Sequence, residues 1–283
     1  MLLSVAKGGR FVAVGDPRQA INGFAGANND SFAKLAKLAD KELPLSCNYR
    51  CGSDIINLAQ DIVPNIVAHA GADKGVIRDV TDLTDLKLGD MVLCRKSAPL
   101  VRVALKCLAN NIRANVMGKD IAQGLVSLIK KAKVRRVETL INYLESEVEK
   151  AEKAHKENAK SMSVSKLEAL KDKVSAINAI AENIDFQANN GIDLLLQKIE
   201  YLFTDKQDKF SRVTFATAHK SKGLENERIF ILLPDKLPLI WKGQKEWQYE
   251  QEMNLKYVAI TRAKKELIWV NIDEKELPNV KIR

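Results

Sequence analysis

The sequence predicts an α/β fold in which a parallel sheet is interrupted by a helical insertion. Short apolar runs alternate with helical segments near both ends of the chain, and alternation at this spacing favours a parallel, doubly wound sheet. The pattern changes between about residues 119 and 210. From Val137 to Glu182 charged residues dominate, glycine and proline are absent, and apolar residues recur three and four positions apart, which is typical of amphipathic helices.

The first part of the chain alternates strand and helix signals. Arg10–Val14 is a short apolar run broken by Gly15, Asp16 and Pro17, so we expect a strand followed by a turn. Ser53 and Ser97 each stand before an apolar helical pattern and are expected N-caps, with Pro99 near the start of the second helix. Two further strands are expected, over Asp90–Arg95 and Ile112–Met117.

Within the insertion, two apolar stripes are separated by the polar run KAHKENAKSMSVS. They predict two antiparallel helices with a turn near Ser161–Ser163. Their stripes are most simply packing surfaces. The α/β pattern then returns, with these expected elements: strands over Val213–Thr217, Arg228–Leu233 and Glu266–Asn271, and a helix over Glu250–Ile260.

The composition bounds the class of protein. Hydrophobic residues make up 46% of the 283 residues, and the formal net charge is +9. That excess is consistent with a polyanionic partner such as nucleic acid, or with a soluble protein that happens to be basic. No stretch reaches the roughly 20 apolar residues that span a bilayer, so we expect no membrane partner and a cytoplasmic location.

The four cysteines (Cys47, Cys51, Cys94 and Cys107) form no CxxC pair, and the three histidines are scattered. We therefore predict free, buried thiols and no metal site in this chain.

Four short motifs follow one another along the chain. They are GDPRQAINGFAGA at 15–27, NYR at 48–50, TAHKSKGLE at 217–225 and YVAITRAK at 257–264. In composition and order they resemble motifs III to VI of superfamily 1 DNA helicases of the UvrD/PcrA/Rep type. NYR alone carries no information, but the last two motifs are each specific, and four in order argue against chance. The chain is therefore similar to the C-terminal half of such a helicase.

The resemblance implies a RecA-like second motor domain of the P-loop NTPase type. Residues 1–35 would be a remnant of the first RecA-like motor domain. Residues 40–118 and 211–283 would be the two parts of the second one, and residues 119–210 the helical insertion between them. This insertion is smaller than the one usual in the family.

The resemblance also implies three residues that act on ATP hydrolysis. Arg50 and Arg262 match the arginine fingers that reach the γ-phosphate, and Gln19 matches the glutamine that senses this phosphate. Phosphoryl transfer spreads negative charge over the phosphate oxygens, and a guanidinium meets that charge with a fixed fork of donors. A surface salt bridge is the alternative for either arginine.

For nucleotide binding, Tyr49 matches the aromatic residue that stacks on adenine, and Glu225 matches the acid that binds the ribose hydroxyls. Gly223 is expected to permit a tight backbone beside that acid. A core tyrosine is the alternative for Tyr49.

For single-stranded DNA, Thr217, His219 and Lys222 match the motif that lines the strand channel, and Phe24 matches an aromatic that packs against bases. A buried, hydrogen-bonded histidine is the alternative for His219. Two departures weaken the expected DNA contacts, because Asn22 replaces the family's usual tyrosine and Ala25 its usual arginine.

One element of the family is absent from the sequence. No GxxxxGK[ST] occurs, and no DExx(D/Q) run precedes residue 10. ATP and Mg²⁺ are thus expected only in a completed enzyme, since that loop and that acid hold them. We expect a separate chain to carry the first motor domain, 3′–5′ movement on single-stranded DNA by the pair, and no activity from this chain alone. The alternatives are a non-catalytic DNA-binding or regulatory module and a non-functional truncated fragment.

Overall fold

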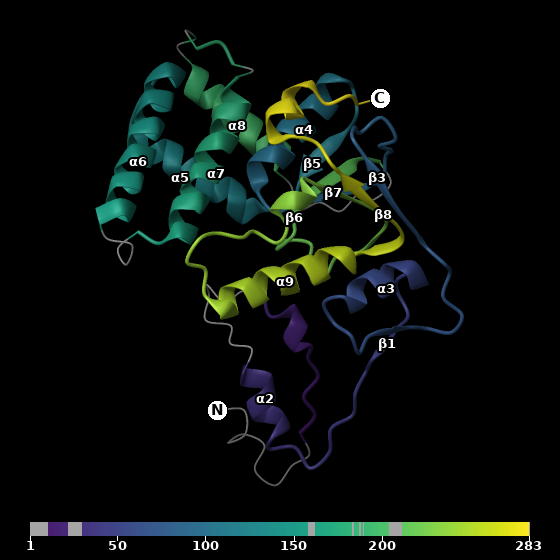
Figure 1. Ribbon diagram of the computed structural model, residues 1–283. Coiled ribbons are helices and arrows are strands. Elements are labelled where there is room, and N and C mark those ends of the chain that lie inside the picture. The colour runs from purple at the N-terminus through teal and green to yellow at the C-terminus, as the bar shows by residue number, and fades with distance from the viewer. Residues whose placement is uncertain are drawn as a thin grey trace.

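A computed structural model describes residues 11–21, 30–157, 162–182, 184–186, 188, 190–203 and 211–282. Its centre is a six-stranded sheet in the order β3-β8-β7-β4-β6-β5, and every neighbouring pair of strands is parallel. Figure 1 shows α3 and α9 on one side of this sheet, α4 on the other, and α5 to α8 in a stack beside it. The predicted α/β class with a parallel sheet is confirmed.

The elements follow one another along the chain with these bounds. The strands are β1 Cys47–Asn48, β2 Val67–Ala68, β3 Val76–Val80, β4 Met91–Cys94, β5 Ala114–Val116, β6 Val213–Thr217, β7 Asn226–Leu232 and β8 Ala263–Val270. The α-helices are α2 Asp30–Ala36, α3 Ser53–Gln60, α4 Ser97–Ala109, α5 Lys119–Ala132, α6 Val137–Glu157, α7 Val164–Ala181, α8 Gly191–Leu202 and α9 Glu246–Ile260. The described residues also form the 3-10 helices η1 Pro17–Gln19, η3 Pro234–Lys236 and η4 Glu274–Asn279.

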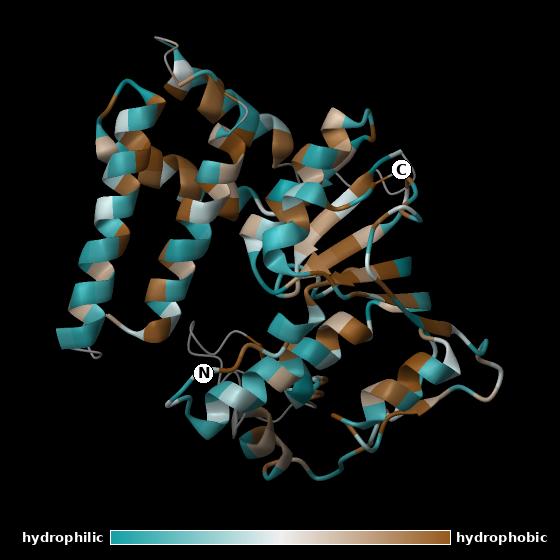
Figure 2. Cartoon of the chain, turned by 45° about the horizontal axis from the view of Figure 1, so that its top comes forward, coloured by the Kyte–Doolittle hydropathy of each residue, from teal (hydrophilic) through white to brown (hydrophobic). Residues whose placement is uncertain are grey.

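Strand β4 shows how the sheet separates two hydrophobic cores. Successive side chains of a strand point to opposite faces, and Met91 and Leu93 lie in the core under α3 and α9, whereas Val92 and Cys94 lie in the core under α4. All four are buried, as expected for a parallel strand covered on both faces. In Figure 2 the strands are brown, and much of the outward surface of the helices is teal.

The helical insertion shares its core with the sheet. Residues of α5 to α8 belong to the same buried cluster as α4 and the strand residues that face it. Polar contacts reinforce this attachment at the start of α4. There, Asp172 of α7 accepts hydrogen bonds from the backbone N–H groups of Ser97 and Ala98, both at 2.9 Å, and from the Ser97 hydroxyl at 2.6 Å. A side chain of the insertion therefore caps a helix of the sheet domain.

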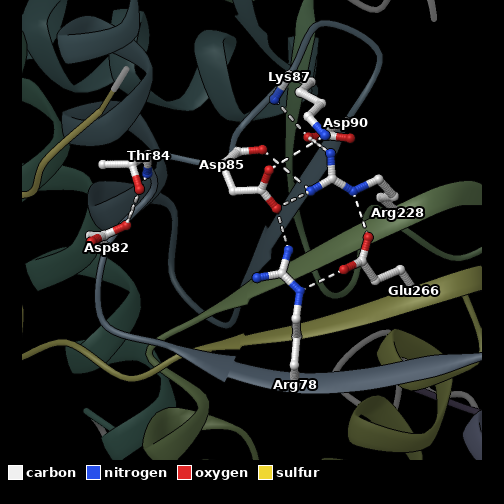
Figure 3. Close-up of polar contacts among 8 residues, drawn as sticks. All are labelled: Arg78, Asp82, Thr84, Asp85, Lys87, Asp90, Arg228 and Glu266. Carbon is white, nitrogen blue, oxygen red and sulfur yellow. Dashed lines mark hydrogen bonds and ion pairs between the residues drawn. The ribbon is translucent and has the colours of Figure 1, made fainter.

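A network of ion pairs fastens the loop before β4 to the sheet (Figure 3). Arg228 of β7 donates to Glu266 at 2.7 Å, to Asp85 at 2.7 Å and to Asp90 at 3.2 Å, and Arg78 of β3 pairs with Asp85 and Glu266. Burial raises the pKa of Asp90 to about 6, although Arg228 lies beside it. The network is satisfied internally and has a structural role.

Most predicted elements are confirmed to within four residues at each end, including the two antiparallel helices α6 and α7. The strand expected at Arg10–Val14 is wrong for the residues described. Residues 11–16 form no strand, and Val12 and Val14 are 83% and 79% exposed, because no described strand pairs with them. Ser53 and Ser97 are also not N-caps. Each is the first helical residue, after Gly52 and Lys96.

Three of the four cysteines are buried, as predicted. Burial raises the pKa of Cys51 to about 11 and the pKa values of Cys94 and Cys107 to about 12, while Cys47 is exposed. Within the described residues, no helix combines the length and apolar character that a membrane span requires.

Candidate functional site

Three distant segments meet at the amino ends of β7 and β8. The backbone N–H of Gly52 donates to the carbonyl of Lys264 at 2.8 Å, and that of Asn226 donates to the carbonyl of Arg262 at 3.0 Å. These bonds bring together the segments at 48–52, 224–226 and 261–264. We call Arg50, Glu225, Arg262 and Lys264 the arginine cluster.

Arg262 is the buried member of the arginine cluster, with 2% exposure. Its Nε donates to the carbonyl of Val258 at 2.9 Å, one terminal nitrogen to the carbonyl of Leu224 at 3.0 Å and the other to the Thr261 hydroxyl at 3.2 Å. Burial, and then the nearby Arg50, lower its pKa. A guanidinium has five N–H donors, and three of them are thus bound, by Val258 in α9, by Thr261 directly after α9 and by Leu224 before β7.

Arg50 is the accessible member. Its Nε donates to Glu225 at 2.8 Å, and Lys264 pairs with the same carboxylate at 2.7 Å. The side chains of Arg50 and Glu225 are each 36% exposed. The hydrogen bond with Lys264, and then the charge of Arg50, lower the pKa of Glu225. One acid therefore holds two cations that can exchange partners with solvent or a ligand.

Two protonated groups lie beneath the arginine cluster. The Cys51 thiol contacts the carbonyl of Thr261 at 3.5 Å, and Tyr257 is 5% exposed, with burial raising its pKa to about 12. Both remain neutral at pH 7, so the positive charge of the cluster is not cancelled from below. The sequence analysis gave no role in the site to these two residues or to Lys264, although Tyr257 and Lys264 stand within the motif YVAITRAK.

Tyr49 is a surface residue and not a core tyrosine. It is 78% exposed, and its ring lies 4.5 Å from that of His69, with an angle of 37° between the planes. A hydrogen bond with the Cys47 side chain raises its pKa. An exposed aromatic face thus adjoins Arg50.

Gln19 lies on η1, which packs against α9. Its side-chain amide donates to Asp16 at 3.0 Å, its backbone carbonyl accepts from the Lys222 ammonium at 2.9 Å, and Arg18 pairs with Glu250 of α9 at 3.1 Å. Gln19 and Lys222, expected to act on nucleotide and DNA respectively, are therefore in direct contact. Phe24, with Asn22 and Ala25, lies outside the described residues.

Thr217 and His219 lie at the carboxyl end of β6. Thr217 is 8% exposed, and its hydroxyl accepts from the backbone N–H of Lys220 at 3.3 Å. Burial, and then the charge of Arg95, lower the pKa of His219 to about 4, so its ring is neutral at pH 7. Beside it Arg95 donates to both oxygens of Glu252 on α9, at 2.8 and 2.6 Å. A neutral ring can stack or share a hydrogen bond, but it brings no charge to a phosphate.

Gly223 has a backbone φ of +86°, and a side-chain carbon placed there would meet nothing within 4 Å. The glycine is therefore required by the left-handed backbone and not by lack of space. Glu225 follows this turn two residues after Gly223 and lies next to Arg50.

Comparison with known proteins agrees with the motifs. The model of the UvrD-like helicase C-terminal domain family matches residues 110–274. A probable DNA helicase of Mycoplasma pneumoniae is 34% identical over 90 residues, which are 31% of this chain and 16% of that protein. The chain thus spans a small part of this relative's length. The family match includes the segments at 217–225 and 257–264 and excludes those at 15–27 and 48–50.

Proposed function

The chain belongs to the UvrD-like helicase C-terminal domain family, and on that premise we propose that it is the C-terminal part of an ATP-dependent 3′–5′ DNA helicase or translocase. It has a helicase-related role. In the proposal it supplies arginine fingers and single-strand contacts, and a first motor domain outside these 283 residues, which we expect on a separate chain, supplies the phosphate-binding loop. Movement follows from closure of the two motor domains around ATP.

The arginine cluster is the observation that carries this proposal. Two guanidinium groups from segments 212 residues apart lie beside one carboxylate, and one guanidinium is accessible while the other is fixed. A developing γ-phosphate charge is stabilised by such donors when they are preorganised. In the proposal Arg50 leaves Glu225 for the phosphate, and Glu225 turns to the ribose. Tyr49 offers its exposed ring to adenine.

The residues that the structure describes do not form a magnesium site. Nowhere in the described parts of the chain do three potential metal-ligating side chains gather. The Mg²⁺ that accompanies ATP would be held by the first motor domain, so no step of the proposal is assigned to metal ligands in this chain.

On the DNA side, Lys222 is an exposed cation of the turn after β6, and its neighbour Lys220 is paired with Asp120. We propose that it meets a phosphate of the single strand, and that Thr217 and the neutral His219 line the channel behind it. The contact between Lys222 and the Gln19 carbonyl would then lie between the DNA and the nucleotide.

ATP hydrolysis stimulated by single-stranded DNA tests the proposal. The assay compares this chain alone, a Walker A-containing polypeptide from the same genome alone, and their mixture. We expect activity in the mixture only. Removal of an arginine finger lowers the rate by about 10³-fold or more in other NTPases, and we expect Arg50→Ala to act similarly. Arg113→Ala, at an exposed arginine without an ion pair among the described residues, is the matched control.

Each other outcome has a definite meaning. Hydrolysis by this chain alone would overturn the proposal. A mixture that binds DNA but does not hydrolyse ATP would favour a non-catalytic DNA-binding module. A mixture that is active and indifferent to Arg50→Ala would remove the finger role from Arg50.

A further inference from the structure

Lys264 stands at an irregular position near the start of β8. The pairing of β7 with β8 shifts register between Asn226 and Arg228. Two residues of β8, Lys264 and Lys265, therefore stand opposite Glu227 of β7, which is the arrangement of a β-bulge. Bulges are rare between parallel strands, and they re-aim side chains next to functional sites. The irregularity thus indicates that the direction of the Lys264 side chain matters.

The position of Lys264 joins the three segments of the arginine cluster. Its backbone carbonyl accepts a hydrogen bond from the N–H of Gly52 at 2.8 Å, two residues after Arg50. Its ammonium pairs with Glu225 at 2.7 Å, and the Lys264 side chain is 34% exposed. Lys264 is therefore in contact both with the loop that carries Arg50 and with the acid that binds Arg50.

Glu225 binds its two cations through different oxygens. Arg50 donates to Oε2 at 2.8 Å, whereas Lys264 pairs with Oε1 at 2.7 Å. One cation can consequently leave while the other contact persists. Because each oxygen of an ionised carboxylate is an acceptor, departure of Arg50 would leave Oε2 available to another donor.

Lys264 is the more firmly held of these two cations. It lies in β8, and Glu225 stands directly before the adjacent strand β7, whereas Arg50 lies in the loop after the two-residue strand β1. The hydrogen bond with Lys264 also lowers the pKa of Glu225 more than the charge of Arg50 does. A ligand that competes for this cluster should therefore displace Arg50 and leave Lys264 in place.

We propose that Lys264 is a positioning residue, which holds Glu225 by Oε1 while a ribose hydroxyl of ATP replaces Arg50 at Oε2. The inference rests on the proposed function, because it takes ATP as the ligand. Arg50 keeps a charge-assisted hydrogen bond when it moves from the carboxylate to the γ-phosphate, and Glu225 keeps a cation. Recognition of the sugar and release of the arginine finger are thereby one exchange.

Removal of Lys264 should retain Arg50 on Glu225, since the departure of Arg50 would then leave the carboxylate without either cation. An exposed ion pair is worth about two- to fivefold in an equilibrium. Lys264→Met should therefore lower kcat/KM for ATP about two- to fivefold in the mixture of this chain with the Walker A-containing polypeptide. The preference of the mixture for ATP over 2′,3′-dideoxyATP, which lacks both ribose hydroxyls, should narrow as well.

The first measurement uses this chain alone and no nucleotide. Carbon-13 NMR of chains labelled at the glutamate carboxyl follows the titration of Glu225, whose signal is assigned by its loss in Glu225→Gln. Lys264→Met should raise the pKa of Glu225 more than Arg50→Met does. An equal or smaller rise would overturn the inference, because Lys264 would then not be the principal partner of Glu225.

The second measurement is a double-mutant cycle on DNA-stimulated hydrolysis in the mixture. Lys264→Met is made in the wild-type chain and in Glu225→Gln, where no carboxylate remains to retain Arg50. We expect the loss in the first background and almost no further loss in the second. Lys264→Arg, which keeps a cation at this position, should preserve most of the activity.

Lys265→Met is the matched control. Lys265 is the neighbouring residue of the bulge, and it pairs with Glu227 at 3.0 Å. The substitution removes the same charge and an exposed ion pair of the same kind. We expect wild-type values of kcat/KM for ATP and an unchanged preference for the ribose hydroxyls.

The outcomes separate this inference from the proposed function. A loss with Lys264→Met that disappears in Glu225→Gln supports the positioning role. An active mixture in which Lys264→Met has no effect, or the same effect in both backgrounds, overturns the inference and leaves the proposed function standing. A mixture that does not hydrolyse ATP overturns the proposed function, and with it the role of Lys264 toward ATP.

Discussion

Arg50 and Arg262 provide the sharpest prediction, because the structure assigns them opposite mechanical roles within one cluster. Arg262→Ala removes three hydrogen bonds from a guanidinium that is 2% exposed. It leaves the carbonyls of Val258 and Leu224 without that partner. Leaving a buried carbonyl without its donor costs about 1.5–2.5 kcal/mol, so the loss at these two acceptors is about 3–5 kcal/mol. Arg50→Ala removes an ion pair that is about one-third exposed and a long hydrogen bond of 3.4 Å to the Thr261 carbonyl, together worth at most about 1 kcal/mol, and Glu225 keeps Lys264.

These free energies translate into separable melting temperatures. A chain of this size loses about 2 °C of melting temperature per kcal/mol. Arg262→Ala should therefore melt about 6–10 °C below the wild type, and Arg50→Ala at most about 2 °C below it. Arg262→Lys should fall between them, because an ammonium keeps the charge but cannot direct donors to three separated acceptors.

Urea and thermal denaturation of this chain alone, followed by circular dichroism, measure the difference without a partner or a nucleotide. Arg113→Ala serves as the control and should remain within about 0.5 kcal/mol of the wild type. Equal and small losses for Arg50→Ala and Arg262→Ala would refute the reasoning, because the buried hydrogen bonds of Arg262 would then contribute nothing to folding.

Three further predictions concern the attachment of the insertion, the pH dependence of stability and the turn before Glu225. Asp172→Ala should lower the free energy of unfolding by about 2 kcal/mol, because it removes the three hydrogen bonds at the start of α4. Urea unfolding should show no comparable loss for the control Glu145→Ala, at an exposed residue without an ion pair among the described residues. Burial raises the pKa of Asp90 to about 6, above its unfolded value of about 3.9, so this group weakens the folded state as the pH rises through 6. Asp90→Asn should accordingly be more stable relative to the wild type at pH 7.5 than at pH 5, and equal differences in the urea midpoint at both values would contradict this. Gly223→Ala and Gly243→Ala, both at positive φ in open space, should each cost about 1–2 kcal/mol, but only Gly223→Ala should also lower DNA-stimulated hydrolysis in the mixture.

The sequence predicted what depends on local pattern. Short apolar runs located β4 and β6, because burial on both faces leaves such runs between polar loops, and the 3.6-residue period located α4. The strand expected at Arg10–Val14 has the same pattern, yet a strand exists only where a neighbour accepts its hydrogen bonds. Ser97 was predicted to be an N-cap from its position. In the structure Asp172, 75 residues away, accepts the hydrogen bonds of the first N–H groups of α4. No local rule identifies such a partner.

The residues of the site that the sequence analysis missed share this dependence on distant partners. Arg95 and Glu252 lie 157 positions apart and carry no motif of their own, but their double hydrogen bond joins the end of β4 to the middle of α9 beside His219. The same helix contacts η1 through Glu250 and Arg18, and in its last turn the Val258 carbonyl accepts a hydrogen bond from Arg262. The turn that carries Lys222 and the buried arginine of the cluster are therefore fastened to one rigid helix. A change at Glu252 in its middle should affect both ends, because any displacement of α9 moves the acceptor of Arg262 together with the wall behind His219.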